Sequence, residues 1–501
     1  MKENIETMEN ITLPEPDIKH FVAWCIHNGG EVAHIPFTQF NSMYPSYCNP
    51  SIFYDKTTDT FRLIQRNVSY TLHHTHGGHW CPWGPLQYAI PQERYNWLET
   101  RNFYGECKDP MKDDWNFHEI KMVERQQMWE FRGLEDARLV DWNGNLYGIG
   151  VRRDDNPAGV GRMNAMLIDR ETKNEQYSIK IKAPGDDKAY CIKNQSIITD
   201  MPYHLIDTFN PLHIIKFDTA YGNVETVVKK EKVKGLSDEG YDMMRGSSQT
   251  IPWKDGHLTI VHTCTMWYTA NKRKYARYLH AFIEYDKDWN IRRMSPLFSF
   301  NDDMVEFCTG MTMKDDDLYI SFALQDNVSY IVKVPAPMIN QFIEEAHDVT
   351  DSTVWGATPD QRELFDYAMD FFNKGDYSAA YTWFLHAVDI FPYTYNEQFM
   401  MARSIANLGH RDVFEHGMWY LCYRHDPNRP EAAAAIAEYY RYRGNYPAAA
   451  HWAVEAYNKV KTHPCHIFFS DKDIENIYRW SMWETSEYDK VSPKAKGHKA
   501  F

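Results

Sequence analysis

The chain has 501 residues, of which 25% are charged, 43% are hydrophobic and 15% are aromatic. These proportions are typical of a globular protein and exclude a fibrous or largely disordered chain. The 54 Lys and Arg against 69 Asp and Glu leave a net charge of −15, which argues against an acidic partner such as nucleic acid or an anionic membrane.

The N-terminal segment MKENIETMENITLPEPD is polar and acidic, and no apolar run along the chain reaches the length of a membrane-spanning helix. We therefore expect neither a signal peptide nor a membrane anchor. The nine Cys are scattered without a C-x-x-C pair, which indicates reduced thiols. Together these features predict a cytoplasmic protein.

From about residue 17 to 350 one sequence pattern recurs five times. Each copy opens with polar or small residues, continues as an alternating apolar run, turns at Asp, Asn or Gly, and alternates again. The copies span residues 49–67, 134–153, 193–211, 245–263 and 306–326. Each copy indicates a strand hairpin, and five of them predict a five-bladed β-propeller over residues 17–350. An irregular β-sandwich of unrelated hairpins is the alternative.

In a propeller the innermost strands begin at one end of the axis, so their polar openings would meet in one funnel. The residues expected there are Asn49, Glu135, Asp136, Arg138, Asn194, Arg245 and Glu306. Strand alternation sets Asp136 and Arg138 on one face and Glu135 on the other. A carboxylate beside a guanidinium stays ionised and can act as a base, although a purely structural ion pair would have the same sequence.

Four histidines fall within residues 73–79, including His76 and His79. They lack a recognisable ligand spacing or a carboxylate partner, so we expect no bound metal. A loop over the funnel, in which His76 and His79 contact sugar or phosphate, is the preferred interpretation. A metal site and a solvated loop are the alternatives.

The segment Glu135-Asp136-Ala137-Arg138 resembles the Glu-Asp-Pro-Arg signature of glycoside hydrolase family 130, the β-mannoside phosphorylases. Glycosyltransferase family 108 shares that five-bladed propeller. Residues 193–218, 245–263 and 305–327 resemble further blocks of these propellers, and a propeller followed by helical repeats resembles a wider group of predicted glycosyltransferases. Ala137 and Gln195 depart from the pattern, where Pro and Trp are usual.

The resemblance implies a catalytic role for Asp136, with Glu135 beside it. It implies that the substrate or its phosphate is bound by the other funnel residues together with Arg152, Arg153 and His262. The activity it implies is an inverting glycosyltransferase, in which Asp136 is the base and a phosphate-activated sugar, such as a nucleotide sugar, is the donor. No cofactor is expected. The acceptor would be a glycan, a protein or, in a phage, a modified DNA base.

Two alternatives remain open. A glycoside phosphorylase or hydrolase acting on β-linked mannosides would use the same fold, and a hydrolase needs a second carboxylate, for which Glu306 is the candidate. A non-catalytic scaffold is the second alternative.

Residues 358–490 predict a separate helical domain. The segment 374–388 aligns with 443–457, and Gly375, Gly409 and Gly444 mark a period of about 34 residues. This period predicts tetratricopeptide-like helix pairs, which offer a surface for a protein partner.

Overall fold

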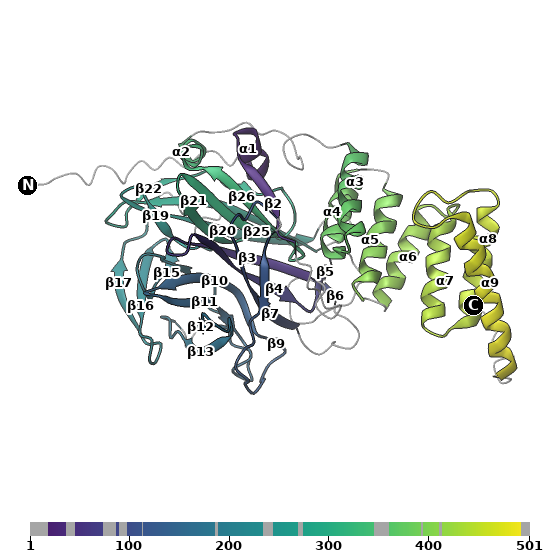
Figure 1. Ribbon diagram of the computed structural model, residues 1–501, viewed down its shortest axis with the longest axis horizontal. Coiled ribbons are helices and arrows are strands. Elements are labelled where there is room, and N and C mark those ends of the chain that lie inside the picture. Colours follow the sequence, from purple (N-terminus) through teal and green to yellow (C-terminus); the bar gives the residue numbers. More distant parts are fainter. Residues whose placement is uncertain are drawn as a thin grey trace, which may run out of the picture. The chain divides into compact units, whose positions relative to one another are not determined.

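The computed structural model describes residues 19–36, 46–73, 87–89, 98–112, 114–185, 189–233, 244–268, 274–344, 360–391, 394–409 and 413–491 (Figure 1). The chain divides into two compact units. One consists of residues 1–74 and 94–359 and the other of residues 75–93 and 360–501. The histidines at 76 and 79 lie outside the described residues. No described helix is long and apolar enough to cross a membrane.

The first unit contains five mainly antiparallel sheets, and the predicted five-bladed β-propeller is confirmed. Blade 1 contains β3 (Ser46–Asp55), β4 (Thr60–Val68), β7 (Leu98–Cys107) and β8 (Asn116–Glu119), with β9 (Phe131–Arg132) parallel to β7. Blade 2 contains β10 (Leu134–Trp142), β11 (Asn145–Arg152), β12 (Arg162–Ile168) and β13 (Glu175–Lys180). Blade 3 contains β14 (Ser196–Ile197), β15 (His204–Phe209), β16 (Leu212–Phe217) and β17 (Val224–Lys229).

Blade 4 is built on the long hairpin of β20 (Gly256–Tyr268) and β21 (Lys274–Tyr285). Its other strands are β18 (Arg245–Gly246), β19 (Ile251–Trp253), β22 (Ile291–Met294) and β23 (Phe298–Ser299). Blade 5 contains β24 (Phe307–Lys314), β25 (Asp317–Leu324) and β26 (Val328–Pro335). Two further short strands are β5 (Thr71–His73) and β6 (Gln87–Ala89).

The N-terminal segment completes the last two blades. Its strand β2 (Glu31–His34) pairs antiparallel with β26 as the fourth strand of blade 5, and β1 (Lys19–His20) pairs parallel with β23 of blade 4. Between them, α1 (Phe21–His27) packs Phe21 and Trp24 on Phe342 of α2 (Ala336–Glu344), with ring centroids 5.1 and 4.8 Å away. The propeller is thus closed by the residues that precede blade 1.

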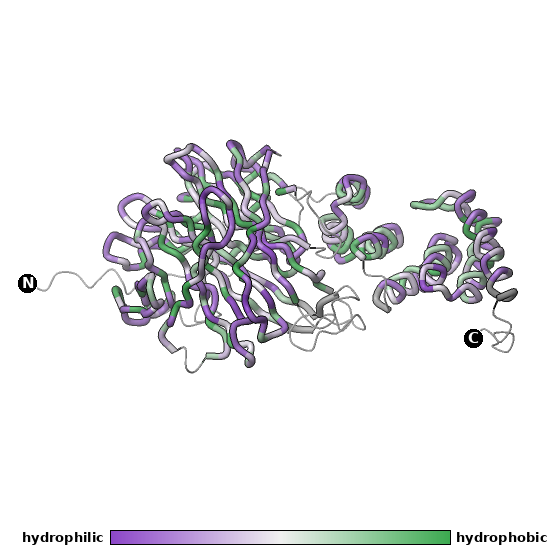
Figure 2. The backbone as a smooth tube through the Cα atoms, turned by 60° about the horizontal axis from the view of Figure 1, so that its bottom comes forward, coloured by the Kyte–Doolittle hydropathy of each residue, from purple (hydrophilic) through white to green (hydrophobic). Residues whose placement is uncertain are grey.

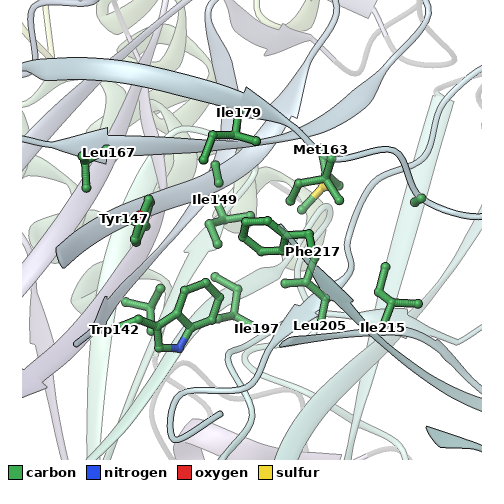
Figure 3. Close-up of a cluster of buried hydrophobic side chains, with 14 of the residues drawn as sticks. Trp142, Tyr147, Ile149, Met163, Leu167, Ile179, Ile197, Leu205, Ile215 and Phe217 are labelled. Carbon is green, nitrogen blue, oxygen red and sulfur yellow. The ribbon is translucent and has the colours of Figure 1, made fainter. Parts of the chain in front are cut away.

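Neighbouring blades are held together by apolar side chains between their faces. Figure 3 shows the cluster between blades 2 and 3, in which Trp142, Ile149 and Met163 of blade 2 meet Leu205 and Phe217 of blade 3. Along the strands, hydrophobic and hydrophilic residues alternate in short stretches (Figure 2), as expected of strands that bury part of their side chains between blades.

The propeller axis is filled by a buried amide. Gln249 donates from Nε2 to Ser51 Oγ and to the carbonyl oxygens of Ile52 and Leu139, at 2.9–3.1 Å. Its Oε1 accepts the backbone N–H of Met311 at 2.8 Å. One side chain therefore joins the first strands of blades 1, 2 and 5, and it closes the axis beneath the strand openings.

The second unit contains α3 (Gln361–Asn373), α4 (Tyr377–Ile390), α5 (Tyr395–Asn407), α6 (Val413–His425), α7 (Pro430–Tyr442), α8 (Tyr446–Val460) and α9 (Asp471–Val491). Gly375, Gly409 and Gly444 follow α3, α5 and α7 with φ of 80°, 90° and 71°, a conformation in which glycine ends a helix without strain. The sequence repeat therefore marks three helix–turn–helix pairs. Their assignment to the tetratricopeptide class stays a prediction.

Candidate functional site

The first strands of blades 1 and 2 carry matching β-bulges at their openings. The pairing register shifts between Cys48 and Ser51 on β3 and between Glu135 and Arg138 on β10. Asn49 and Asp136 lie in these bulges with φ of 51° and 52°, a region in which Asn and Asp are the best-tolerated residues after Gly. Such strained positions concentrate at functional sites.

The bulges bring Asn49 and Asp136 into contact. The Asp136 carboxylate is only 5% exposed, and its Oδ1 accepts hydrogen bonds from Asn49 Nδ2 at 2.7 Å and from Arg66 Nη1 at 2.9 Å. Its Oδ2 accepts no hydrogen bond from the described residues. One carboxylate oxygen is therefore fixed, and the other is available to a ligand.

Electrostatics keep Asp136 ionised. Burial by itself would raise the pKa of this carboxyl, but the charges of Arg66, Lys193 and Arg138 and the hydrogen bond from Asn49 hold the pKa below its usual value. Arg66 is itself buried, on β4 of blade 1, and its Nε donates to Thr100 Oγ1 at 3.1 Å. The Arg66–Asp136 ion pair thus joins blades 1 and 2 at the axis.

A second carboxylate, Asp326, lies in the turn after β25 of blade 5. Tyr70 donates its hydroxyl to Asp326 Oδ2 at 3.1 Å. Burial and the negative charge of Asp136 raise the pKa of Asp326, while Arg66, Tyr70 and Lys193 oppose this shift. Asp136 and Asp326 therefore share one electrostatic environment, in which their pKa values move in opposite directions.

Arg138 lies elsewhere than strand alternation predicts. The bulge in β10 inserts one residue, and the Arg138 guanidinium therefore reaches backbone oxygens. It donates from Nε to Ser247 O at 2.6 Å and from Nη1 to Asp136 O at 3.0 Å. The Arg138 Nη2 also lies 3.5 Å from Asn194 Oδ1. Burial lowers the pKa of Arg138 to about 10, so the group stays charged. Arg138 thus ties blade 2 to blades 3 and 4 through hydrogen bonds, while its charge still helps to lower the pKa of the Asp136 carboxyl.

Arg152 and Arg153 follow at the end of β11, beside the opening of β10. Arg152 is buried and forms an ion pair with Asp154 at 3.3 Å. Arg153 is half-buried between the rings of Phe131 and Tyr190, with centroids 4.7 and 4.9 Å from its guanidinium carbon, and its Nε donates to Gly159 O at 3.0 Å. Of the two, Arg153 is the better placed to bind an anion from solvent.

Blade 4 contributes a cation and a neutral imidazole. Arg245 is exposed on β18, and its Cα partner across the strand pair is His262. Burial lowers the pKa of His262 well below its usual value, and His280, Arg138, Lys193 and Arg245 add to the effect, so His262 is uncharged at neutral pH. Lys193 and Arg138 also shift the pKa of Asp136, which indicates that His262 lies near Asp136 at the end of the propeller axis where the first strands begin, which we call the mouth.

The remaining predicted residues differ in their placement. Asn194 is buried with a φ of 63°, a third left-handed residue at a blade opening, and Glu135 is half-buried. Glu306 is fully buried and accepts the backbone N–H groups of Phe300, Asn301 and Asp303 at 2.6–2.9 Å. Glu306 therefore holds its own loop, and the second carboxylate near Asp136 is Asp326.

The prediction missed Arg66, Asp326, Lys193 and Tyr70. The prediction from the sequence considered the residues at which the first strand of each blade begins. It gave less weight to the ends of the second strands, which run antiparallel to the first strands and return to the same end of the axis. Cys48 pairs with Arg66, Leu134 with Arg152 and Arg245 with His262. Charged or imidazole residues that interrupt an apolar run at the end of a second strand were the available signal.

This mouth combines a fixed, ionised carboxylate, a second carboxylate that retains its proton to higher pH, and several cations. Two carboxyl groups with divergent pKa values are the arrangement that acid–base catalysis requires. The cations Lys193 and Arg245 can bind an anionic group such as phosphate. No cluster of three or more metal-binding side chains occurs in the part of the chain that the structure describes.

A hollow of about 510 Å³ lies away from this mouth. It is lined by the opposite ends of the first strands, including Asp55, Asp141, Asp200 and Thr312. Asp55 follows Asn49 by six positions along β3, which separates these ends from the mouth by about 20 Å.

No protein-family model matches this sequence, and no curated protein matches it. Among solved structures, the propeller is similar to the β-1,2-mannobiose phosphorylase of Listeria innocua, with 11% identity and a TM-score of 0.41, covering 63% of this chain and 99% of that chain. It is also similar to MPT-4, a mannose phosphorylase of Leishmania mexicana, with 12% identity and a TM-score of 0.38, covering 62% and 89%. A further match, with 12% identity, a TM-score of 0.23 and coverage of 28% and 99%, is the Yersinia enterocolitica secretion chaperone SycD.

Proposed function

We propose that this protein is a carbohydrate-active enzyme of the glycoside phosphorylase or hydrolase type, which exchanges the group at an anomeric carbon with inversion. The observation that carries the proposal is the pair Asp136 and Asp326, which come from different blades and have pKa values shifted in opposite directions. Glycoside cleavage uses two carboxyl groups in this way, one as acid and one as base.

In this proposal Asp326 is the general acid. Its raised pKa favours the protonated carboxyl, which can donate its proton to the glycosidic oxygen as the bond to the leaving sugar breaks. Asp136 stays ionised, and its unengaged Oδ2 accepts a proton from the attacking water. With phosphate as the nucleophile no base is needed, and Asp136 orients a sugar hydroxyl instead.

The cations of the mouth support phosphate as the second reactant. Lys193 is half-buried and Arg245 is exposed, so both are reachable from solvent, and Arg153 is held in place by two aromatic rings. A β-linked mannoside is the proposed sugar substrate, on the resemblance of the Glu135–Arg138 segment to the mannoside phosphorylases.

An inverting glycosyltransferase remains the second candidate. The feature that favours it is the lowered pKa of Asp136 together with its free oxygen, which suits a base that deprotonates an acceptor hydroxyl. In that case Lys193, Arg245 and Arg153 would bind the phosphate of a nucleotide-sugar donor. Cytoplasmic localisation stays a prediction for either activity.

The experiment that separates these activities is a substrate panel read by mass spectrometry. Manno-oligosaccharides are incubated with the full chain, with and without inorganic phosphate, and acceptor sugars are incubated with nucleotide sugars. A sugar 1-phosphate that forms only with phosphate supports the phosphorylase, and free sugar without phosphate supports the hydrolase. Transfer from a nucleotide sugar alone supports the glycosyltransferase. Inactivity throughout would favour the scaffold interpretation, in which Arg66–Asp136 is a structural ion pair.

A further inference from the structure

The turn between β25 and β26 presents Asp326 at the mouth and buries the residues on either side of it. Gln325 and Asn327 are buried, whereas Asp326 between them is half-buried. Gln325 and Asp326 both have a positive φ, of 55° and 52°, which is the pattern of a tight hairpin turn. Asp326 is therefore the residue of this turn that a ligand can reach.

Both flanks of the turn are tied to other parts of the propeller. Gln325 donates from Nε2 to the two carboxylate oxygens of Asp303, at 2.9 and 3.1 Å. On the other flank, Ser46 donates from Oγ to Asn327 Oδ1 at 2.8 Å. The backbone of Asp326 is thus fixed between the loop that precedes blade 5 and the first strand of blade 1.

The side chain of Asp326 is held by Tyr70, which lies in the segment between β4 and β5. Tyr70 is buried, and its hydroxyl donates to Asp326 Oδ2 at 3.1 Å. Oδ1 of Asp326 accepts no hydrogen bond from the described residues. A carboxyl group that accepts a hydrogen bond at one oxygen carries its own proton on the other. The contact with Tyr70 therefore favours a protonated Oδ1.

Several other elements bring titratable or charged groups near Asp326. These groups are Cys48 of β3, Arg66 of β4, Asp136 of β10, Lys193 before β14 and Tyr278 of β21. Burial raises the pKa of Cys48 and of Tyr278, so both stay uncharged. Arg66 is already paired with Asp136. Among the described residues, Tyr70 is thus the group that hydrogen-bonds to the Asp326 carboxylate, and it favours the ionised form.

We propose that Tyr70 is a positioning residue for the general acid Asp326, because it fixes Oδ2 and leaves the proton on Oδ1 for the sugar. This inference rests on the proposed function and adds the residue that orients the acid. In the reaction, the proton passes from Oδ1 to the glycosidic oxygen. That oxygen keeps the electron pair of its broken bond to the anomeric carbon, while phosphate or water bonds to the carbon.

The hydrogen bond from Tyr70 also assists this proton transfer. Asp326 becomes negatively charged as its proton leaves, and a hydrogen bond to an ionised acceptor is stronger than one to a neutral acceptor. Tyr70 therefore stabilises the carboxylate that forms, although it does not contact the sugar. Loss of the Tyr70 hydroxyl should slow the reaction and leave the binding of the substrate unchanged.

The first test is Tyr70→Phe, which removes the hydroxyl and keeps the ring. We expect kcat to fall about 10-fold with KM unchanged. The alkaline limb of the pH profile of kcat/KM should move to higher pH, because the hydrogen bond from Tyr70 lowers the pKa of Asp326 and its loss raises that pKa. In the Asp326→Asn background, Tyr70→Phe should reduce the rate no further.

The matched control is Tyr285→Phe, which removes a buried hydroxyl that has no hydrogen-bond partner among the described residues. It should leave kcat and the alkaline limb unchanged. If Asp326→Asn lowers activity and Tyr70→Phe does not, the role of Tyr70 is wrong and the proposed function stands. If Asp326→Asn has no effect, the acid assignment itself is wrong, and the role of Tyr70 is rejected with it.

The second test needs no turnover. In the full chain labelled with carbon-13 at the Asp carboxyl groups, the NMR signal of Asp326 is the one that disappears in Asp326→Asn. Its titration midpoint should lie at higher pH in Tyr70→Phe than in the parent and stay unchanged in Tyr285→Phe. An unchanged midpoint in Tyr70→Phe would overturn the inference in an active protein as well. A raised midpoint in a chain that acts on no sugar would uphold the contact and reject the proposed function alone.

Discussion

Asp136 offers one oxygen to two donors and leaves the other free, so its charge can be removed with little change of shape. Asp136→Asn retains an oxygen for Asn49 and Arg66 but removes the base, and we expect a loss of activity of about 10²–10⁴-fold. The buried Arg66 also loses its counter-ion, so the free energy of unfolding should fall by about 1–3 kcal/mol. Steady-state kinetics and urea unfolding measure the two effects.

The control for this variant is Glu135→Gln, which alters the neighbouring, half-buried carboxylate. It should change activity far less than Asp136→Asn. If Glu135→Gln costs as much activity, or Asp136→Asn costs none, the assignment of Asp136 is wrong.

The opposite pKa shifts of Asp136 and Asp326 predict how the reaction depends on pH. The lowered pKa of Asp136 makes kcat/KM rise as that group loses its proton at acidic pH. The raised pKa of Asp326 makes kcat/KM fall once the pH exceeds that pKa, because the acid is then lost. We therefore expect a bell-shaped profile whose alkaline limb disappears in Asp326→Asn while the acidic limb remains. An unchanged alkaline limb would assign the acid to another group.

At the scale of one strand, the bulge of β10 depends on a glycine in its neighbour. A Cβ at Gly150 on β11 would lie 2.3 Å from the Glu135 carbonyl oxygen and 3.0 Å from the Ala137 Cα, both of them backbone atoms that cannot turn aside. Gly150→Ala should therefore displace the bulge and destabilise the propeller by about 1–3 kcal/mol. It should also reduce activity through Asp136, although residue 150 contacts no substrate.

Gly144→Ala is the control for Gly150→Ala, and it should lower the stability of the protein slightly by itself. Gly144 lies in the β10–β11 turn, and no atom lies within 4 Å of an added Cβ there, but its φ of 81° makes alanine mildly unfavourable. Gly144→Ala should therefore cost stability and leave activity intact. Equal activity losses for both variants would remove the link between the bulge and catalysis.

At the scale of the whole molecule, ring closure depends on the N-terminal strand. Deleting residues 1–36 removes β2, so β26 becomes an open edge, and it removes Phe21 and Trp24 from their buried aromatic cluster. Two large aromatic side chains alone account for about 5 kcal/mol or more. We expect an aggregating or unfolded propeller by circular dichroism. A stable, active propeller without residues 1–36 would contradict the closure.

Much of this architecture could be predicted from the sequence by itself. The alternation of apolar residues in five copies determined the number of blades, and glycines at a period of about 34 residues determined the helix pairs. Both signals are local, because strand alternation and helix ends are set by neighbouring residues. Asp136 and Asn49 were identified for the same reason, as polar residues at the openings of apolar strands.

The composition of the mouth was decided only by the tertiary structure. Asp136 meets Arg66 of blade 1 and the field of Asp326 of blade 5, partners 70 and 190 residues away in the chain that only closure of the ring brings together. The bulge of β10 changed the direction of Arg138, because one inserted residue reverses the alternation on which its placement was predicted. Glu306 satisfies three backbone N–H groups of its own loop, a role that depends on the path of the backbone and leaves no regular spacing in the sequence.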